Sequence, residues 1–180
     1  VVIIGAGMAG ILTAIKLREA GYDNYVIYEK SDSVGGTWRE NTYPGIACDV
    51  PAHMYTYSFE PNPDWSRTYA PGPEIHAYFQ RVAEKYGVLE KIRFNESIPH
   101  CEFEDGKWHI RTSTDREDKA DIVIAATGVL HYPHVADIPG LDSFAGTCFH
   151  SARWDHSVDL KGQAIASIGT GASAIQYAPE

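Results

Sequence analysis

The sequence predicts an α/β fold in which a parallel β-sheet carries helices between its strands. Short and almost wholly apolar runs, such as Val1–Ile4 and Asp121–Ala126, are typical of strands that are buried on both faces of a parallel sheet. Between these runs, Met8, Ile11, Leu12 and Ile15 recur at helical spacing. A strand is followed directly by a glycine-rich turn at two places in the chain, which indicates two α/β units.

The first half of the chain predicts a strand, a helix and a second strand. After the strand Val1–Ile4, the helix begins near Met8 and closes near Gly21, and Tyr25–Tyr28 forms the next strand. Residues 31–73 then form a long irregular segment that is rich in Gly, Pro, Asn, Asp and aromatic residues. Since so long a loop is uncommon in a compact domain, we expect it to carry function.

The second half predicts a helix followed by mostly β-structure. The helix begins near Pro73, and its apolar face is formed by Ile75, Tyr78, Phe79, Val82 and Tyr86. Short alternating runs between Ile92 and Thr114 predict antiparallel strands, and Asp121–Ala126 predicts a buried strand. A last strand is expected at Ala164–Ile168, directly before the second glycine turn.

Composition excludes several classes of protein. The formal charge of the 180 residues is −9 without a basic cluster, which argues against nucleic acid as a partner. No apolar run is long enough to span a membrane and no signal peptide is apparent, so we expect a cytoplasmic protein with reduced thiols. The histidines and the three cysteines show no metal-ligand spacing, so no metal is expected. Both ends of the chain read as interrupted elements, which suggests part of a larger enzyme.

The first glycine turn has the pattern that binds a dinucleotide. Gly5, Gly7 and Gly10 fit GxGxxG between a strand and a helix. The first glycine permits the tight turn, the second lets the backbone approach a pyrophosphate, and the third lets the helix pack on the strand. Glu29 ends the next strand, nineteen residues after Gly10, where a carboxylate accepts hydrogen bonds from a ribose. The turn therefore predicts a Rossmann-like dinucleotide-binding unit.

A second turn repeats this pattern near the end of the chain. Gly169-Thr170-Gly171-Ala172-Ser173-Ala174 has alanine in the third position, which the pattern permits. Two such turns imply two dinucleotides, which excludes a dehydrogenase with a single Rossmann unit. The pair points instead to a flavoprotein that takes hydride from a nicotinamide.

The segment between the two turns carries a family resemblance. Residues 144–155 match F-x-G-x-x-x-H-x-x-x-W-[P/D], which resembles the fingerprint of type I Baeyer–Villiger monooxygenases. Its fixed positions are Phe144, Gly146, His150, Trp154 and Asp155. Residues 34–38, 43–45, 48–49, 55–59 and 126–128 also resemble that family. Within it, residues 36–45 and 150–156 look most like the hydroxyacetophenone monooxygenase branch.

The resemblance implies an activity and its cofactors. In this family NADPH reduces FAD, O2 adds to the reduced flavin as a C4a-peroxyflavin, and a ketone becomes an ester or a lactone. The family resemblance also implies the organisation of the chain. Residues 1–157 would form the FAD-binding domain, including the fingerprint, and residues 158–180 would begin an NADP-binding domain.

Site residues follow from the motifs and the resemblance together. Those expected at FAD and at the nicotinamide end are Gly5, Gly7, Gly10, Glu29, Lys30, Gly36, Thr37, Trp38, Arg39, Glu40, Ala47, Cys48, Asp49, Tyr55 and the backbone of Ile98. Those expected at NADP are Thr170, Gly171, Ala172, Ser173, Ala174 and Gln176. Asp49 would lie beside the flavin ring and position a catalytic arginine from outside these residues.

Two alternatives stay open at this point. A related flavin monooxygenase that oxygenates nitrogen or sulfur shares the pattern up to His150 but ends its fingerprint with a different aromatic residue. A pyridine nucleotide–disulfide reductase shares both glycine turns but needs a redox-active cysteine pair near the flavin. Cys48 has no second cysteine nearby, which disfavours the reductase.

Overall fold

A four-stranded parallel sheet forms the centre of the molecule. The computed structural model describes all residues, 1–180. The sheet has the order β3-β2-β1-β7, and its strands are β1 (Val2–Ile4), β2 (Val26–Tyr28), β3 (Ile92–Arg93) and β7 (Val123–Ala125). β1 pairs with β2 in the register Val2 to Val26 and with β7 in the register Val2 to Val123. The predicted α/β fold is confirmed.

Both faces of this sheet are covered, which explains why β1, β2 and β7 are apolar throughout. Ile3 and Ile27 point to one face and join the core formed with the helices. Val2 and Tyr28 point to the other face, where they pack against Ile110 of an antiparallel sheet. Since side chains alternate along a strand, a strand covered on both sides needs apolar residues at every position.

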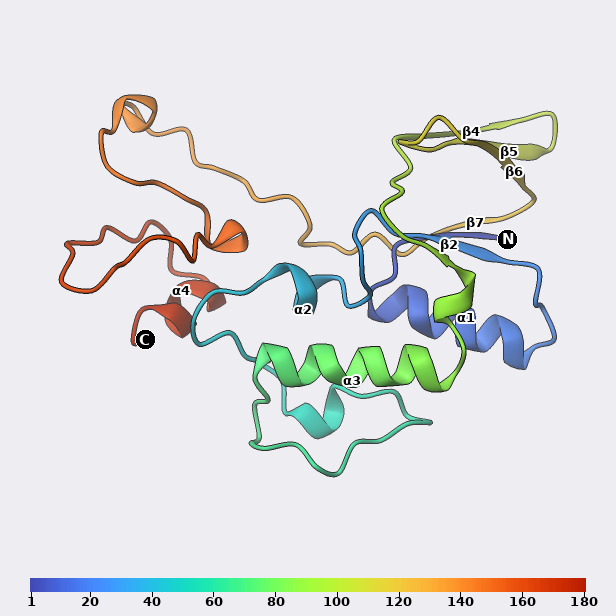
Figure 1. Ribbon diagram of the computed structural model, residues 1–180, viewed down its shortest axis with the longest axis horizontal. Coiled ribbons are helices and arrows are strands. Elements are labelled where there is room, and N and C mark those ends of the chain that lie inside the picture. Colours follow the sequence, from blue (N-terminus) through green and yellow to red (C-terminus); the bar gives the residue numbers. More distant parts are fainter.

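Helices α1 (Met8–Glu19) and α3 (Gly72–Lys85) lie together on one side of the sheet (Figure 1). α3 buries Ile75, Tyr78, Phe79 and Val82, the face that the sequence predicts. α1 buries Gly10, Ile11, Ala14 and Ile15, whereas Met8 is 40% exposed. Its buried face is therefore rotated from the predicted one, because small residues at positions 10 and 14 let the helix lie close to the sheet.

A three-stranded antiparallel sheet covers the opposite face. It consists of β4 (His100–Glu104), β5 (Lys107–Arg111) and β6 (Glu117–Ala120), in that order. The prediction of antiparallel strands is correct for β4 and β5 but wrong for Ile92–Arg93, which pairs parallel with β2 in the main sheet. A strand of only two residues, such as Ile92–Arg93, has no sequence period that could distinguish parallel from antiparallel pairing. β6 was not predicted because its sequence, Glu-Asp-Lys-Ala, is almost wholly polar.

The long segment after β2 contains little regular structure. It includes the short helix α2 (Thr37–Glu40), for which four residues show no helical period in the sequence. The 3-10 turns of the chain are η1 (Ala52–Met54), η2 (Leu89–Lys91), η3 (Leu141–Ser143) and η4 (Ser151–Arg153). None of the helices has the length and apolar character needed to cross a membrane.

Beyond β7 the chain leaves the sheet and continues as a long looping segment with little regular structure to the helix α4 (Ala172–Tyr177) (Figure 1). The strand expected at Ala164–Ile168 does not form, so that prediction is wrong. A strand requires a hydrogen-bonded neighbour, and no other segment of these residues pairs with it. Ile165 and Ile168 are accordingly 62% and 65% exposed. The glycine turn and the helix after it do form.

Candidate functional site

Two glycines of the first turn are required by packing. Gly5 has a φ of +100°, and a Cβ placed on it would lie 2.6 Å from the carbonyl oxygen of Ala126. A Cβ on Gly10 would lie 1.9 Å from the carbonyl oxygen of Gly5. No side chain fits at either position, because helix, turn and strand approach one another too closely.

Gly7 is different, because packing does not require it. Its φ of −75° suits any residue, and an added Cβ would lie 3.6 Å from Cα of Gly36, an ordinary contact. Gly7 is the N-cap of α1, and no side chain caps that helix. The amides of its first turn therefore have no side-chain acceptor within the chain, so they remain available to an anion.

Glu29 is held at the carboxyl end of β2, next to this turn. Its side chain is buried, with Oε2 accepting a hydrogen bond from the Ala6 amide at 2.7 Å and Oε1 accepting one from the Ser31 amide at 3.0 Å. The expected position of Glu29 beside the Gly5–Gly10 turn is confirmed. Each oxygen has a lone pair left, so the carboxylate retains acceptor capacity for a ribose hydroxyl.

A charged cluster joins the end of β2 to α2 and to the segment after β7. Lys30 Nζ lies 2.6 Å from Glu40 Oε1 and 2.9 Å from His131 Nε2, and His131 Nδ1 lies 3.4 Å from Glu40 Oε2. Burial opposes ionisation of Glu40, but the hydrogen bond and charge of Lys30, with His131 and Arg39, outweigh burial and lower the pKa of the carboxyl. Glu40 is therefore ionised at neutral pH, and its charge joins α2 to Lys30 at the end of β2 and to His131.

Arg39 lies in the same helix and has a buried donor without a partner. Its Nη2 donates to Ser31 Oγ at 2.5 Å and to Glu40 Oε1 at 3.2 Å. Its Nε is buried and has no hydrogen-bond partner within the chain. A buried donor without a partner is costly, so this atom is available to an acceptor that is not part of these residues.

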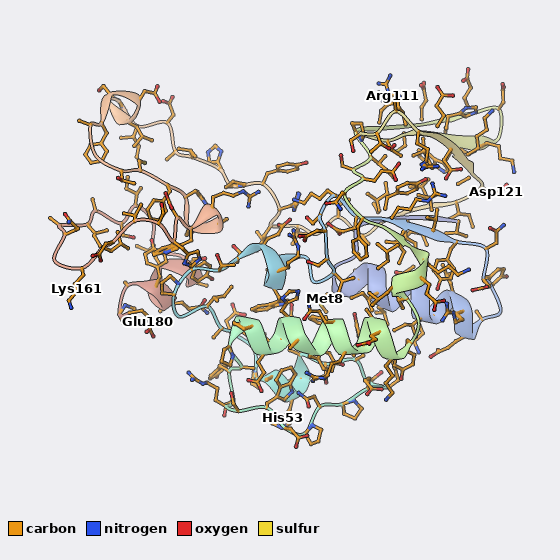
Figure 2. The ribbon with its side chains drawn as sticks, viewed as in Figure 1. Met8, His53, Arg111, Asp121, Lys161 and Glu180 are labelled. Carbon is orange, nitrogen blue, oxygen red and sulfur yellow. The ribbon has the colours of Figure 1, made fainter.

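Aromatic side chains connect α2 to the start of α1. Trp38 Nε1 donates to the Tyr55 hydroxyl at 3.2 Å, and that hydroxyl lies 3.3 Å from Met8 Sδ. The buried Tyr57 donates to the carbonyl oxygen of Met8 at 2.5 Å. Figure 2 shows Met8 at this junction, between α1, α2 and α3. These contacts hold the first turn of α1 against the loop that carries the other predicted site residues.

A cleft of about 470 Å³ opens beside α2. Its walls include Trp38, Arg39 and Ala47, which were predicted, and Arg67 and His76, which were not. Asp49 is exposed two residues beyond Ala47, and its carboxylate makes no ion pair within the chain. It is therefore free to bind a cation from outside these residues. Ile98 lies farther away and packs with the antiparallel sheet.

The second glycine turn is open on its outer side. Gly169 has a φ of +114°, and a Cβ on Gly171 would meet nothing within 4 Å. Gly171 is the N-cap of α4, with no capping side chain. Gln176, at the other end of α4, donates from Nε2 to the carbonyl oxygen of Ala47 at 2.8 Å and accepts with Oε1 from the Ala47 amide at 3.3 Å. The sequence predicted a cofactor contact for Gln176 and gave no signal for this one.

The fingerprint residues are mostly engaged in local contacts. A Cβ on Gly146 would lie 2.6 Å from the ring of Phe144, so the glycine makes room for that ring. His150 Nδ1 accepts from the Ala152 amide at 3.0 Å, and Asp155 accepts from the Ser157 hydroxyl at 2.6 Å. Trp154 packs against Tyr177 of α4, with ring centroids 5.3 Å apart. The fingerprint therefore connects β7 to α4, and it lies apart from the first glycine turn.

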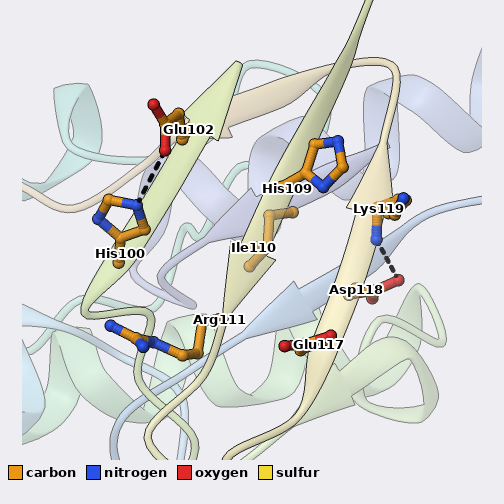
Figure 3. A pocket seen from close by; sticks show the side chains of 8 residues that line it. All are labelled: His100, Glu102, His109, Ile110, Arg111, Glu117, Asp118 and Lys119. Carbon is orange, nitrogen blue, oxygen red and sulfur yellow. Dashed lines mark hydrogen bonds and ion pairs between the residues drawn. The ribbon is translucent and has the colours of Figure 1, made fainter. Parts of the chain in front are cut away.

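A second cleft of about 680 Å³ lies on the outer face of the antiparallel sheet (Figure 3). Most of its lining side chains are polar or charged residues of β4, β5 and β6, including His100 and Glu102, whose Nε2 and Oε2 lie 3.6 Å apart. This cleft is far from both glycine turns and contains one apolar residue. We regard it as the solvated face of the sheet rather than as the site.

Comparison with known proteins identifies the family. Residues 2–180 match the family model described as pyridine nucleotide-disulphide oxidoreductase. The chain belongs to this family. A "Baeyer-Villiger monooxygenase" of Streptomyces coelicolor is 49% identical over 99% of this chain and 35% of its own length. One of Pseudomonas aeruginosa is 46% identical over 100% of this chain and 34% of its own length.

Solved structures agree with these relatives. Cyclohexanone monooxygenase bound to epsilon-caprolactone has a TM-score of 0.91 at 32% identity, with 99% of this chain and 36% of that chain covered. A steroid monooxygenase bound to NADP has a TM-score of 0.88 at 37% identity, with 99% and 35% covered. The resemblance to Baeyer–Villiger monooxygenases is thereby confirmed. The chain spans about a third of the length of the relatives it matches.

Proposed function

We propose that the complete protein is an FAD- and NADPH-dependent monooxygenase that inserts one oxygen atom of O2 beside a ketone carbonyl, giving an ester or a lactone. The observation that carries this proposal is the fingerprint Phe144–Asp155, which lies between two glycine turns and ends in Trp154-Asp155. Relatives named Baeyer–Villiger monooxygenases support it along nearly the whole of this chain.

The first glycine turn fits FAD. The uncapped amides of α1 would bind the pyrophosphate, and Glu29, which lies beside the same glycine turn, would bind the ribose. The unpartnered Nε of Arg39 supplies a further donor next to these groups. Bound FAD would supply the redox chemistry, namely reduction by NADPH and activation of O2 at flavin C4a as a peroxide. Trp38, Tyr55 and Ala47 would enclose the flavin and exclude water.

The second turn fits the nicotinamide cofactor in the same way. Space in front of Gly171 is open, and the start of α4 offers uncapped amides to a pyrophosphate. Residues 170–174 would bind it, with residues 158–180 as the beginning of the NADP-binding domain. The preference for NADPH over NADH comes from the family and from relatives whose structures contain NADP.

Asp49 would act through an arginine that lies outside these residues. Its exposed and unpaired carboxylate is available to a guanidinium, which prefers a carboxylate partner in a fixed geometry. The pair would place a positive charge where hydride arrives and where negative charge later develops. His150 and the other fingerprint residues would link the two nucleotide-binding units rather than contact the reacting atoms.

A flavin monooxygenase that oxygenates nitrogen or sulfur is the second candidate, because it would use the same two glycine turns. Disulfide reduction is disfavoured, since Cys48, Cys101 and Cys148 are all free and only Cys48 is buried near the site. Turnover of a panel of small ketones and amines by the complete enzyme with NADPH tests the proposal. We expect esters or lactones from the ketones. Oxygenated amines without any ester would overturn the proposal.

A further inference from the structure

Gln176 joins the second glycine turn to the loop that precedes Asp49. Its amide makes a two-point contact with the backbone of Ala47, donating at 2.8 Å and accepting at 3.3 Å. The Tyr43 hydroxyl donates to the same Oε1 at 2.9 Å. Oε1 thus accepts two hydrogen bonds, and one N–H of Nε2 remains unused, so little of the side chain is left for a cofactor.

Packing around this contact is close. A Cβ on Gly45 would lie 2.3 Å from the carbonyl oxygen of Gln176, so only glycine lets the loop approach the end of α4. The ring of Tyr43 packs edge-on against Tyr177, with centroids 6.1 Å apart, and Tyr177 in turn contacts Trp154 of the fingerprint. The contact is therefore part of a packed junction rather than an isolated hydrogen bond.

The opposite edge of the same loop is anchored to α3. Ala47 bridges Pro71, the Cys48 amide donates to the carbonyl oxygen of Ala70 at 3.0 Å, and the Gly72 amide donates to that of Ile46 at 2.9 Å. Residues 46–48 thus lie as a strip between the start of α3 on one side and Gln176 on the other. Asp49 follows directly, so the backbone that sets its position is held from both sides.

We propose that Gln176 is a positioning residue that transmits occupancy of the second glycine turn to the loop carrying Asp49, and that it is not a ligand of the nicotinamide cofactor. This inference rests on the proposed function for the role of Asp49. A cofactor bound at Gly171 would order the start of α4, and Gln176 lies at the end of the same short helix. Its amide converts a shift of that helix into a shift of the Ala47 backbone.

The test begins with the contact itself, in the complete protein without NADPH. Cys48 is buried and adjoins Ala47, and burial raises the pKa of its thiol, so it reacts with iodoacetamide only when the loop opens. Gln176→Ala keeps helix propensity and Gln176→Glu keeps the acceptor while removing the donor. In both variants we expect labelling of Cys48, located by peptide mass spectrometry, to be faster by about tenfold.

Thr42→Val is the matched control. The Thr42 hydroxyl lies 2.8 Å from His156 Nε2, so it also bridges the loop and the fingerprint region, but it does not touch Ala47. Labelling of Cys48 should stay at the wild-type rate in this variant. Unchanged labelling in both Gln176 variants would overturn the proposal, and this readout does not depend on which reaction the enzyme performs.

Kinetics then separate positioning from binding. In Gln176→Ala the Kd for NADPH should stay within about twofold, whereas the rate of flavin reduction at saturating NADPH should fall by about tenfold. Combining Gln176→Ala with Asp49→Ala should cost little more than Asp49→Ala alone, because both act through one loop. A weaker Kd at an unchanged saturating rate would identify Gln176 as a nucleotide ligand and overturn the proposal. Faster labelling at an unchanged reduction rate would equally overturn the positioning role.

Discussion

Replacing Gly7 with alanine adds one methyl group at the mouth of the first glycine turn, where the account places the FAD pyrophosphate. The structure predicts little effect on folding. The backbone φ of −75° is open to any residue, and the new Cβ would lie 3.6 Å from Gly36 Cα. Alanine is a poorer N-cap than glycine, which costs about 0.5–1 kcal/mol, or roughly 1–4 °C in melting temperature.

The effect on FAD should be much larger. The methyl group would occupy the space through which the pyrophosphate approaches the α1 amides, so we expect two charge-assisted hydrogen bonds to be lost. At about 1.5–3 kcal/mol each, this weakens FAD binding by roughly a hundredfold to ten-thousandfold. Purified protein should therefore be colourless, while its circular dichroism spectrum stays that of the wild type.

The assay is titration of flavin-free protein with FAD, followed by quenching of flavin fluorescence. Gly10→Ala serves as the contrast, because its Cβ would lie 1.9 Å from the Gly5 carbonyl oxygen and should prevent folding. An FAD affinity within threefold of wild type in a folded Gly7→Ala variant would refute the assignment of this turn to FAD.

Three further changes test other parts of the site. A Cβ on Gly171 meets nothing within 4 Å, so Gly171→Ala should leave the protein folded and yellow. The Kd for NADPH, measured by anaerobic stopped-flow reduction, should rise by at least about tenfold. Loss of flavin in this variant would mean that the two turns are assigned in reverse. Asp49→Ala should slow flavin reduction on the order of a hundredfold with FAD retained, and wild-type rates would leave Asp49 as a turn residue only. The folded pKa of Glu40 lies below its ordinary 4.5, so its ionic contribution is present above about pH 4.5 and is lost as pH falls through the lower folded value. Glu40→Gln should therefore cost about 1 kcal/mol at pH 7, which lowers the melting temperature of the flavin-free protein by roughly 2–4 °C. At pH 3.5 the melting temperature should fall by less. Equal differences between variant and wild type at both pH values would contradict the ionic role of Glu40.

Sequence periodicity predicts the central fold because burial and period coincide there. β1, β2 and β7 are apolar at every position, since one face meets the helices and the other meets the antiparallel sheet. α3 shows the helical period on its buried face. Periodicity does not predict an element whose structure depends on pairing with another segment of the chain rather than on its own apolar pattern. β6 is almost wholly polar and forms because Trp108–Arg111 of β5 provides its partner.

Motifs predict the candidate site better than they predict its supporting contacts. The roles of Gly5, Gly10 and Glu29 follow from one local pattern, and the structure brings all three together. His131 lies 101 residues beyond Lys30, and Gln176 lies 129 residues beyond Ala47. Residues so far apart in the sequence form no local motif, so only the folded structure reveals the charged cluster and the Ala47 contact.

Transfer of labelled oxygen tests the central claim most directly. The complete enzyme is supplied with NADPH, 18O2 and a small cyclic ketone, and the product is analysed by mass spectrometry with fragmentation. We expect a lactone that carries one 18O atom, located in the ring between the carbonyl carbon and its former carbon neighbour. A ketone recovered unchanged, with 18O found instead in an amine or a sulfide supplied alongside it, would contradict this reaction.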